Sequence, residues 1–321
     1  MSPVSVIVPT YNYAHYISEA IDSVLSQSYP RELIEIIVVD DGSADNTREV
    51  LKKYIDNGLV HYSFQENKGK ANATKNAISI AQGEYIFNLD ADDYFFPSKI
   101  EETVQIFEQF PDVVHVGSPA KIIYQDKNEE IIESLPRDLV EKPISGRALL
   151  NRFYRENILF GGGSTYAARS SILKSINIPD LVDMYIDEFL ILAVLPFGKS
   201  FLLNKDLSAW RVHHSNYSGH GLSKEKQKQK EERLLKSSLA VLKYVNENKF
   251  DDFIRKIYRL KNTTRIMSFK EGYSKKSFGD ILRYAYEVIF QIQPGIKVMR
   301  NYYVLNKFIP TRLYHLLKRM K

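Results

Sequence analysis

Residues 4–8, Val-Ser-Val-Ile-Val, form an apolar and mostly β-branched run that stops at Pro9. Such a run is typical of a β-strand buried on both faces, as in the sheets of α/β proteins. Apolar residues then recur at helical spacing, at Ala14, Ile17, Ile21, Val24 and Leu25. The N-terminal stretch therefore predicts a strand followed by an amphipathic helix.

The same alternation continues through the first hundred residues. Strand-like runs occupy residues 34–39, 60–64 and 85–89, and helix-like runs occupy residues 46–55 and 71–81 between them. This rhythm predicts an α/β fold with a mostly parallel, Rossmann-like sheet and helices on both faces. Ligands of such sheets bind beyond the carboxyl ends of the strands, so the residues that end each strand are the first functional candidates.

Composition excludes several classes of protein. Of the 321 residues 44% are hydrophobic and 26% are charged, as in an ordinary globular protein. The chain has no cysteine, which excludes disulfide scaffolds, cysteine nucleophiles and thiolate metal sites and suits a reducing cytoplasm. We expect neither a signal peptide nor a membrane-spanning helix, because no window reaches roughly 18 uninterrupted apolar residues.

Charge divides the chain into two parts. Residues 1–223 carry 20 basic and 30 acidic side chains, whereas residues 224–321 carry 24 basic and 9 acidic ones. From this change and the helical character of the tail we expect a main domain of residues 1–222 and a helical region of residues 223–321. The excess of cations predicts an anionic partner for the tail, either lipid headgroups or nucleic acid.

Asp90-Ala91-Asp92-Asp93 directly follows a predicted strand. Carboxylates two residues apart on extended chain point to the same side and repel each other unless a cation lies between them. Mg²⁺ or Mn²⁺, which prefer oxygen ligands and share substrate phosphates, fit such a site. The alternative is a solvated acidic loop that caps the helix after Pro97.

Other polar residues end the neighbouring strands. Asp40-Asp41-Gly42-Ser43 can accept hydrogen bonds from a base or a ribose, or form a tight turn that caps a helix. Pro9-Thr10-Tyr11-Asn12 offers an aromatic ring for stacking, and Asn67-Lys68-Gly69 leads to Lys75, whose ammonium could approach a diphosphate. Each of these is an ordinary loop by itself.

In their order along the chain, these four motifs resemble the nucleotide-binding half of family 2 glycosyltransferases with the GT-A fold. The resemblance covers residues 3–100 closely and weakens to about residue 217. It implies that residues 1–100 bind a nucleotide sugar and that residues 101–222 form the acceptor side of the catalytic domain.

The resemblance also assigns roles to individual positions. Thr10 and Tyr11, between Pro9 and Asn12, match residues that hold the base, and Asp41 matches the acid that reads it, with Asp40 beside it. Asp90 and Asp92 flank Ala91 as the two ends of the family's Asp-x-Asp motif. Asp92 corresponds to the direct metal ligand, and Asp90 to the residue that faces the sugar. Lys75 stands where members of the family often have arginine. A lysine supplies the same positive charge but cannot form the bidentate contact that arginine makes.

Two later segments resemble further motifs of the family. Ile186-Asp187-Glu188-Phe189-Leu190 matches the acidic motif that supplies a general base, which falls on Asp187 with Glu188 as the alternate. Trp210-Arg211-Val212-His213 matches a segment near the departing diphosphate, where Arg211 neutralises charge and His213 contacts metal or phosphate. The alternatives are a first-turn acid favoured by the helix dipole and a structural His–Arg pair. The Gly161-Gly162-Gly163-Ser164 loop could let the backbone approach the acceptor sugar or form a flexible surface turn.

The resemblance implies a metal-dependent, inverting transferase that moves a sugar from a nucleotide-diphosphate sugar, UDP first among the candidates. The acceptor would be a glycan or lipid-linked glycan of the cell surface. A nucleotidyltransferase is an alternative, although the first loop lacks the Gly-rich, basic sequence that holds a triphosphate. A non-catalytic scaffold is another, although it would not need the full acidic set.

The end of the tail mixes apolar and aromatic residues with many cations, for example Tyr302, Tyr303, Phe308, Leu313 and Leu316 among Lys297, Arg300, Lys307, Arg312 and Lys318. This mixture suits helices lying on an anionic membrane, and we expect a cytoplasmic enzyme peripheral to the inner face of the cell membrane. The alternative is packing on the catalytic domain or on a second subunit. Nucleic acid is not expected, because the tail shows no recognisable binding module.

Overall fold

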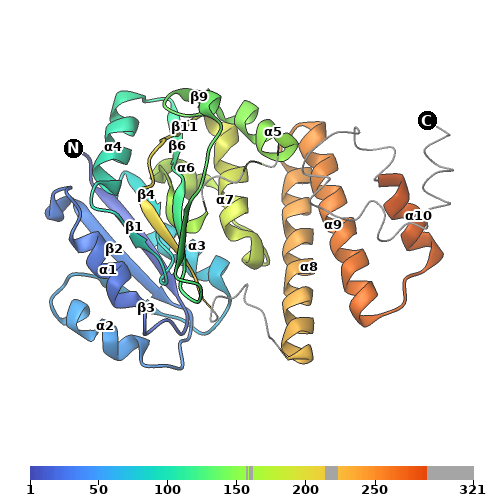
Figure 1. The fold of residues 1–321 in the computed structure, drawn as a ribbon, viewed down its shortest axis with the longest axis horizontal. Coiled ribbons are helices and arrows are strands. Elements are labelled where there is room, and N and C mark those ends of the chain that lie inside the picture. The colour runs from blue at the N-terminus through green and yellow to red at the C-terminus, as the bar shows by residue number, and fades with distance from the viewer. Residues whose placement is uncertain (157, 159–161, 214–222, 288–321) are drawn as a thin grey trace. The chain divides into compact units, whose positions relative to one another are not determined.

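The structure, a computed structural model, describes residues 1–156, 158, 162–213 and 223–287 (Figure 1). The chain forms two compact units. The first comprises Met1–Leu149, Leu159–Asp180 and Ile186–His220, and the second comprises Leu150–Ile158, Leu181–Tyr185 and Gly221–Lys321. Two short segments of the first 222 residues thus group with the C-terminal helices.

An eight-stranded sheet in the order β3-β2-β1-β4-β10-β6-β11-β9 forms the centre of the first unit. Its strands are β1 (Val4–Thr10), β2 (Ile34–Asp40), β3 (His61–Phe64), β4 (Tyr85–Asn88), β6 (Val113–Gly117), β9 (Pro143–Ser145), β10 (Tyr166–Arg169) and β11 (Lys199–Leu202). The pairs β1–β2, β1–β4, β2–β3 and β6–β11 are parallel, which confirms the α/β fold class with a sheet of mainly parallel pairs. β10 runs antiparallel between β4 and β6, and β9 is antiparallel to β11.

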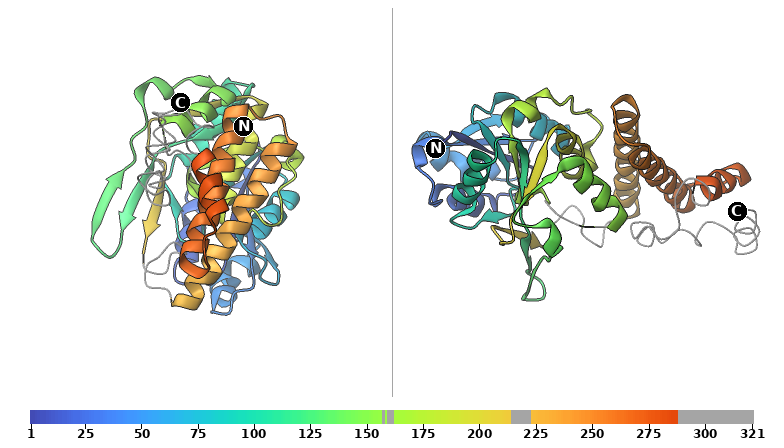
Figure 2. Two further views of the ribbon diagram at one scale, coloured as in Figure 1. Left: turned by 90° about the vertical axis from the view of Figure 1, so that its right-hand side faces the viewer. Right: turned by 90° about the horizontal axis from the view of Figure 1, so that it is seen from above.

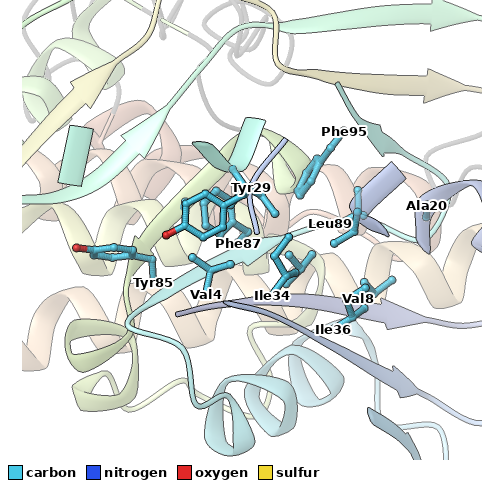
Figure 3. Close-up of a cluster of buried hydrophobic side chains, with 14 of the residues drawn as sticks. Val4, Val8, Ala20, Tyr29, Ile34, Ile36, Tyr85, Phe87, Leu89 and Phe95 are labelled. Atoms are coloured by element: carbon cyan, nitrogen blue, oxygen red, sulfur yellow. The ribbon is translucent and has the colours of Figure 1, made fainter. Parts of the chain in front are cut away.

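Helices lie on both faces of this sheet (Figure 1). α1 (Ile17–Leu25), α2 (Thr47–Asp56) and α4 (Lys99–Gln109) lie on one face, and α3 (Lys70–Ile80), α6 (Ser170–Ser175) and α7 (Ile186–Val194) lie on the other. On the first face Val4, Val6 and Val8 of β1 join one apolar cluster with residues of the three helices, part of which Figure 3 shows. This burial on both faces explains why the strand sequence is apolar without alternation.

A second, four-stranded sheet in the order β5-β12-β7-β8 lies in the same unit. It consists of β5 (Tyr94–Phe95), β7 (Ala120–Tyr124), β8 (Glu129–Ile132) and β12 (Ser208–Val212). β5 begins just after the acidic motif, and β12 pairs with it antiparallel. This pairing brings the Arg211 segment, which is itself a strand, next to the acidic motif although more than a hundred residues separate them in the chain.

The second unit is helical. α8 (Lys224–Glu247) and α9 (Asp252–Tyr273) pack side by side, followed by α10 (Phe278–Tyr286), and the last residues of α5 (Gly146–Glu156) belong to the same unit (Figure 2). Among the described residues no helix is long and apolar enough to cross a bilayer. The mixed apolar and basic sequence at residues 297–321 lies outside the described part of the chain.

Candidate functional site

The carboxyl ends of β1, β2 and β4 meet at one edge of the large sheet. Thr10 pairs in register with Asp40, and the backbone N–H of Asp41 donates to the Thr10 carbonyl at 2.9 Å. Asp90 follows β4 by two residues. The parallel strands therefore place the three predicted strand-end motifs together, as expected from their topology.

The aspartates after β2 organise the loop that leads into α3. The carboxylate of Asp41 accepts hydrogen bonds from the backbone N–H groups of Lys68 and Gly69, both at 2.8 Å, and from Gln65 at 2.7 Å. The carboxylate of Asp40 accepts from the Ser43 backbone at 2.8 Å and from the Tyr62 hydroxyl at 3.0 Å. Both acids thus fix local backbone at this edge.

The loop after β1 combines buried and exposed groups. Pro9 and Thr10 are the last residues of β1, and the buried Thr10 hydroxyl has no hydrogen-bond partner within the described chain. The Tyr11 ring is 45% exposed, which leaves it open to stack on a ligand. Asn12 has a left-handed backbone (φ 59°), and its side chain accepts from the Ala44 backbone at 2.7 Å, which ties this loop to the turn after β2.

Three carboxylates gather just beyond β4. Asp90, Asp92 and Asp93 each offer an oxygen, and these atoms all lie within 4.8 Å of one another. Ala91 between them is buried in the core cluster, and the backbone N–H of Asp93 donates to the Asp90 carbonyl at 3.0 Å, which closes a turn around the three carboxylates. Asp92 lies 3.2 Å from the Nε2 atom of His213.

Crowding alters the protonation of this cluster. Burial, together with the nearby Asp187 and Asp92, raises the pKa of Asp90 to about 6, although Lys70 opposes the shift. Burial and the charges of Asp92 and Asp90 also raise the pKa of Asp93 well above its usual range. Concentrated negative charge with oxygen ligands is the environment that a hard divalent cation stabilises, so these residues fit Mg²⁺ or Mn²⁺.

Aromatic residues from the start of the chain line the cluster. The Tyr13 hydroxyl donates to Asp92, and burial, with the charges of Asp92 and Asp90, raises the Tyr13 pKa. The ring of Tyr16 stacks on His213, with 4.5 Å between centroids. His213 is almost fully buried, so its imidazole is held in place facing Asp92.

Arg211 is fixed within the protein. Its guanidinium donates to the backbone carbonyl of Asp92 and to Glu19, and its carbon lies 4.9 Å from the Tyr16 ring centre and 5.2 Å from that of Tyr94. Its backbone N–H donates to Asp93 at 3.0 Å. In this structure Arg211 therefore anchors the turn of residues 90–93, called the acidic turn below, to the four-stranded sheet.

Asp187 comes to the same site from the first turn of α7. The ammonium of Lys70 donates to Asp187 at 2.9 and 3.1 Å, and to Asp90 at 2.9 Å. Glu188, the next residue of that turn, is half-buried. Lys75 lies one and a half turns further along α3 and pairs with Asp180 at 2.9 Å, where both side chains are well exposed.

A glycine and a serine hold the acidic turn from the other side. The hydroxyl of Ser164 accepts from the Asp90 backbone at 3.0 Å and donates to the Asp93 carboxylate at 2.5 Å. A Cβ atom added to Gly163 would lie 2.6 Å from a carboxylate oxygen of Asp90, so this position admits only glycine in the present arrangement. Gly161 lies outside the described residues.

Sequence reasoning missed Lys70 and Tyr13 as parts of the site, and it included Ser164 only as the end of the glycine-rich loop. Lys70 directly follows the Asn67-Lys68-Gly69 motif, so its position at the start of a helix on the functional edge was an available signal. Tyr13 carried none, and the bonds of Ser164 to Asp90 and Asp93 could not be foreseen, because each depends on a turn whose path the sequence pattern does not define.

Comparisons with known proteins identify the family of this chain. The model of the family described as "Glycosyl transferase family 2" matches residues 5–176. An uncharacterized glycosyltransferase of Nostoc sp. is 33% identical over 225 residues, which cover 66% of each chain. A putative teichuronic acid biosynthesis glycosyltransferase of Bacillus subtilis, TuaG, is 42% identical over 104 residues, 32% of this chain and 40% of that protein.

Solved structures show the same fold. The S. aureus protein TarS (residues 1–349), in a crystal structure with UDP-GlcNAc, matches with a TM-score of 0.62 at 20% identity, covering 98% of this chain and 86% of that one. The chain spans two thirds or less of the lengths of the curated relatives it matches, about a third for several of them. The family match covers more than half of the chain, from β1 through the acidic turn to α6. This chain belongs to glycosyl transferase family 2 and has its GT-A type of α/β fold.

Proposed function

We propose that this protein is a metal-dependent, inverting glycosyltransferase that transfers a sugar from a nucleotide-diphosphate sugar to a glycan. The observation that carries the proposal is the meeting of Asp90, Asp92 and Asp187 at one edge of the sheet, where Lys70 contacts both Asp90 and Asp187. Family membership supports the reaction class, and the TarS complex supports UDP as the nucleotide.

Residues at the ends of β1 and β2 would bind the nucleotide. Tyr11 is exposed for stacking, and the buried Thr10 hydroxyl has no partner among the described residues and can bond to a ligand. Asp41, with Asp40 beside it, would be the acid that reads the base. Lys75 would approach the diphosphate after leaving its exposed partner Asp180, since an exposed ion pair is weak.

Asp92, Asp90 and His213 are the candidate ligands of Mn²⁺ or Mg²⁺. A bound divalent ion would supply Lewis-acid stabilisation of the charge that develops on the leaving diphosphate. Arg211 holds the backbone of Asp92 and Asp93, so its contribution is to keep the ligands aligned. A mannosyltransferase of Pyrobaculum calidifontis, whose structure is a complex with GDP-Man and Mn²⁺, matches with a TM-score of 0.50.

Asp187, with Glu188 as the alternate, would act as the general base. Its carboxylate lies at the start of α7 and a third exposed, so an acceptor hydroxyl can reach it. It would take the proton of that hydroxyl while the oxygen attacks the anomeric carbon and the bond to the diphosphate breaks. A single displacement of this kind inverts the configuration.

The rest of the chain would bind the acceptor and the membrane. Residues 101–222 are the proposed acceptor side, and the tail, residues 223–321, is the proposed membrane contact. A surface polysaccharide or lipid-linked glycan is the proposed acceptor, which fits the name of the teichuronic acid relative. The described part of the second unit is rich in lysine and arginine, which supports its attraction to an anionic membrane from the cytoplasmic side.

A thermal-shift panel tests this function. UDP, GDP, TDP and CMP are each added with Mn²⁺ or with EDTA, since a ligand that binds only the folded state raises the unfolding temperature. We expect a metal-dependent rise with UDP, and Asp187→Asn should keep that rise while transfer falls by about 10²–10⁴-fold. The proposal would be contradicted if no nucleotide raised the unfolding temperature, or if Asp187→Asn transferred sugar at a near-normal rate.

A further inference from the structure

Lys70 connects two carboxylates that come from distant parts of the chain. Its ammonium lies 2.8 and 2.9 Å from the two oxygens of Asp90 and 2.9 and 3.1 Å from those of Asp187. Asp90 belongs to the turn after β4, and Asp187 to the first turn of α7. One side chain therefore sets the separation of the sugar-facing carboxylate and the proposed base.

The local structure gives no reason for a lysine at this position. Lys70 is the first residue of α3, where the helix dipole disfavours a cation. Gly69 before it has a positive φ of 93° and directs the chain into the helix without a side-chain cap. The two carboxylates are what stabilise a cation there, and they raise the Lys70 pKa although burial lowers it.

The other carboxylates of the cluster have different partners. Asp92 faces His213 and Tyr13, and Asp93 accepts from Ser164 and from the Arg211 backbone. Within the described chain Asp90 is thus the carboxylate of this turn that Lys70 links to the proposed base, whereas Asp92 and Asp93 are held by other side chains. Lys70 is about a third exposed, so a bound substrate can reach it and replace its bonds to Asp90.

We propose that Lys70 is a positioning residue, which holds the base Asp187 at a fixed distance from Asp90 so that a donor bound at Asp90 lies within its reach. This inference rests on the proposed function. A hydroxyl of the donor sugar that bonds to Asp90 takes the place of one contact of the Lys70 ammonium. The remaining contact, between Lys70 and Asp187, keeps the base directed at the anomeric carbon. Lys70 therefore acts on the chemical step through Asp187, with little effect on nucleotide binding.

A double-mutant cycle tests the inference. The wild type is first tested with UDP-GlcNAc, UDP-glucose, UDP-galactose and UDP-glucuronate. The sugar nucleotide that it turns over fastest is then used, with Mn²⁺, to measure UDP release by every variant. Water is the acceptor: its oxygen bonds to the anomeric carbon, the bond to UDP breaks, and its proton passes to Asp187. The variants of the cycle are Lys70→Met, Asp187→Asn and the double variant. The matched control is Lys52→Met, which removes an exposed lysine of a surface ion pair.

We expect Lys70→Met to lower kcat by about 100-fold, the cost of a misplaced catalytic group, with KM for the donor nearly unchanged. In the Asp187→Asn background the same change should cost less than about threefold, because residues that act as a unit are not additive. Lys70→Arg should recover at least about tenfold over Lys70→Met by restoring the cation. Lys52→Met should behave as the wild type.

Other results would overturn the inference. Lys70→Met could lower kcat by the same factor in the wild type and in Asp187→Asn, or raise KM and leave kcat intact. Lys70→Arg could also be no more active than Lys70→Met. Each of these results would show that Lys70 does not act through Asp187. If Lys70→Met does not fold, Lys70→Gln takes its place in the cycle, and Lys70→Arg remains the variant that restores the cation. A wild type that neither binds UDP nor releases it from any of these sugars contradicts the proposed function itself, and the inference falls with it.

Discussion

Lys99 shows how a single buried charge couples the core to the acidic turn. It is 1% exposed, and its ammonium donates to the Thr165 carbonyl at 2.8 Å and to the Ser118 hydroxyl at 3.2 Å. No carboxylate bonds to it within the described chain, and burial lowers its pKa to about 7. Since Ser164 precedes Thr165, the same lysine also supports the turn that holds Asp90 and Asp93.

This lysine predicts a pH dependence of stability. Between pH 7 and about 10 the unfolded chain binds a proton at Lys99 that the folded chain has lost, so the free energy of unfolding gains up to about 1.4 kcal/mol per pH unit from this group. Lys99→Met removes that slope. Urea unfolding at pH 7 and pH 9.5 should therefore show a smaller gain for Lys99→Met than for the wild type. An equal gain in both, with Lys52→Met as the exposed control, would contradict the assignment.

At the scale of the element, the 3-10 turn Gly163–Thr165 acts as the clamp of the acidic turn. A methyl group at position 163 would meet the Asp90 carboxylate at 2.6 Å, whereas one at Gly162 would meet nothing within 4 Å. Gly163→Ala must therefore displace Asp90. We expect it to lower kcat/KM for a UDP-sugar by about tenfold or more, a cost typical of a misplaced group. Gly162→Ala is the matched control, and equal activity of the two variants would exclude this clamp.

The elements differ in how well the sequence predicts them. β1, β2 and β4 are recognisable because nearly all of their residues are buried and most are apolar. The structure extends β1 and β2 by one or two residues into the site. β5, β10 and β12 have two to five residues each, and their partners lie far away in the sequence. Short strands of this kind depend on tertiary pairing, so their pattern alone does not identify them.

The same limit applies to the site residues. Asp90, Asp92 and the strand-end loops could be predicted because parallel topology brings strand ends to one edge. The place of Lys70 between Asp90 and Asp187 could not, because it depends on the side-chain direction at the start of α3. Lys75 drew attention by resemblance, yet in the structure it pairs with Asp180, and its role at the diphosphate stays a prediction.

At the scale of the whole molecule, charge separates two regions of the chain. Residues 224–321 carry 24 basic and 9 acidic side chains, against 20 and 30 in the residues before them. We expect the full chain to co-sediment with vesicles that contain phosphatidylglycerol and to remain in the supernatant with phosphatidylcholine alone. Binding should weaken between 50 and 500 mM NaCl, because salt screens surface charges. Equal binding to neutral vesicles, or none to either, would contradict a charge-driven membrane contact.

The proposed function requires that the acidic edge of the sheet bind a nucleoside diphosphate together with a divalent ion. Isothermal titration of UDP into the wild type and into Asp92→Asn, each with Mn²⁺ and with EDTA, measures this requirement. We predict that EDTA weakens UDP binding by the wild type at least about tenfold, roughly 1.4 kcal/mol. Asp92→Asn should bind UDP equally weakly with and without metal. Wild-type affinity that is unaffected by EDTA, or an Asp92→Asn variant that keeps the full metal effect, would contradict the account.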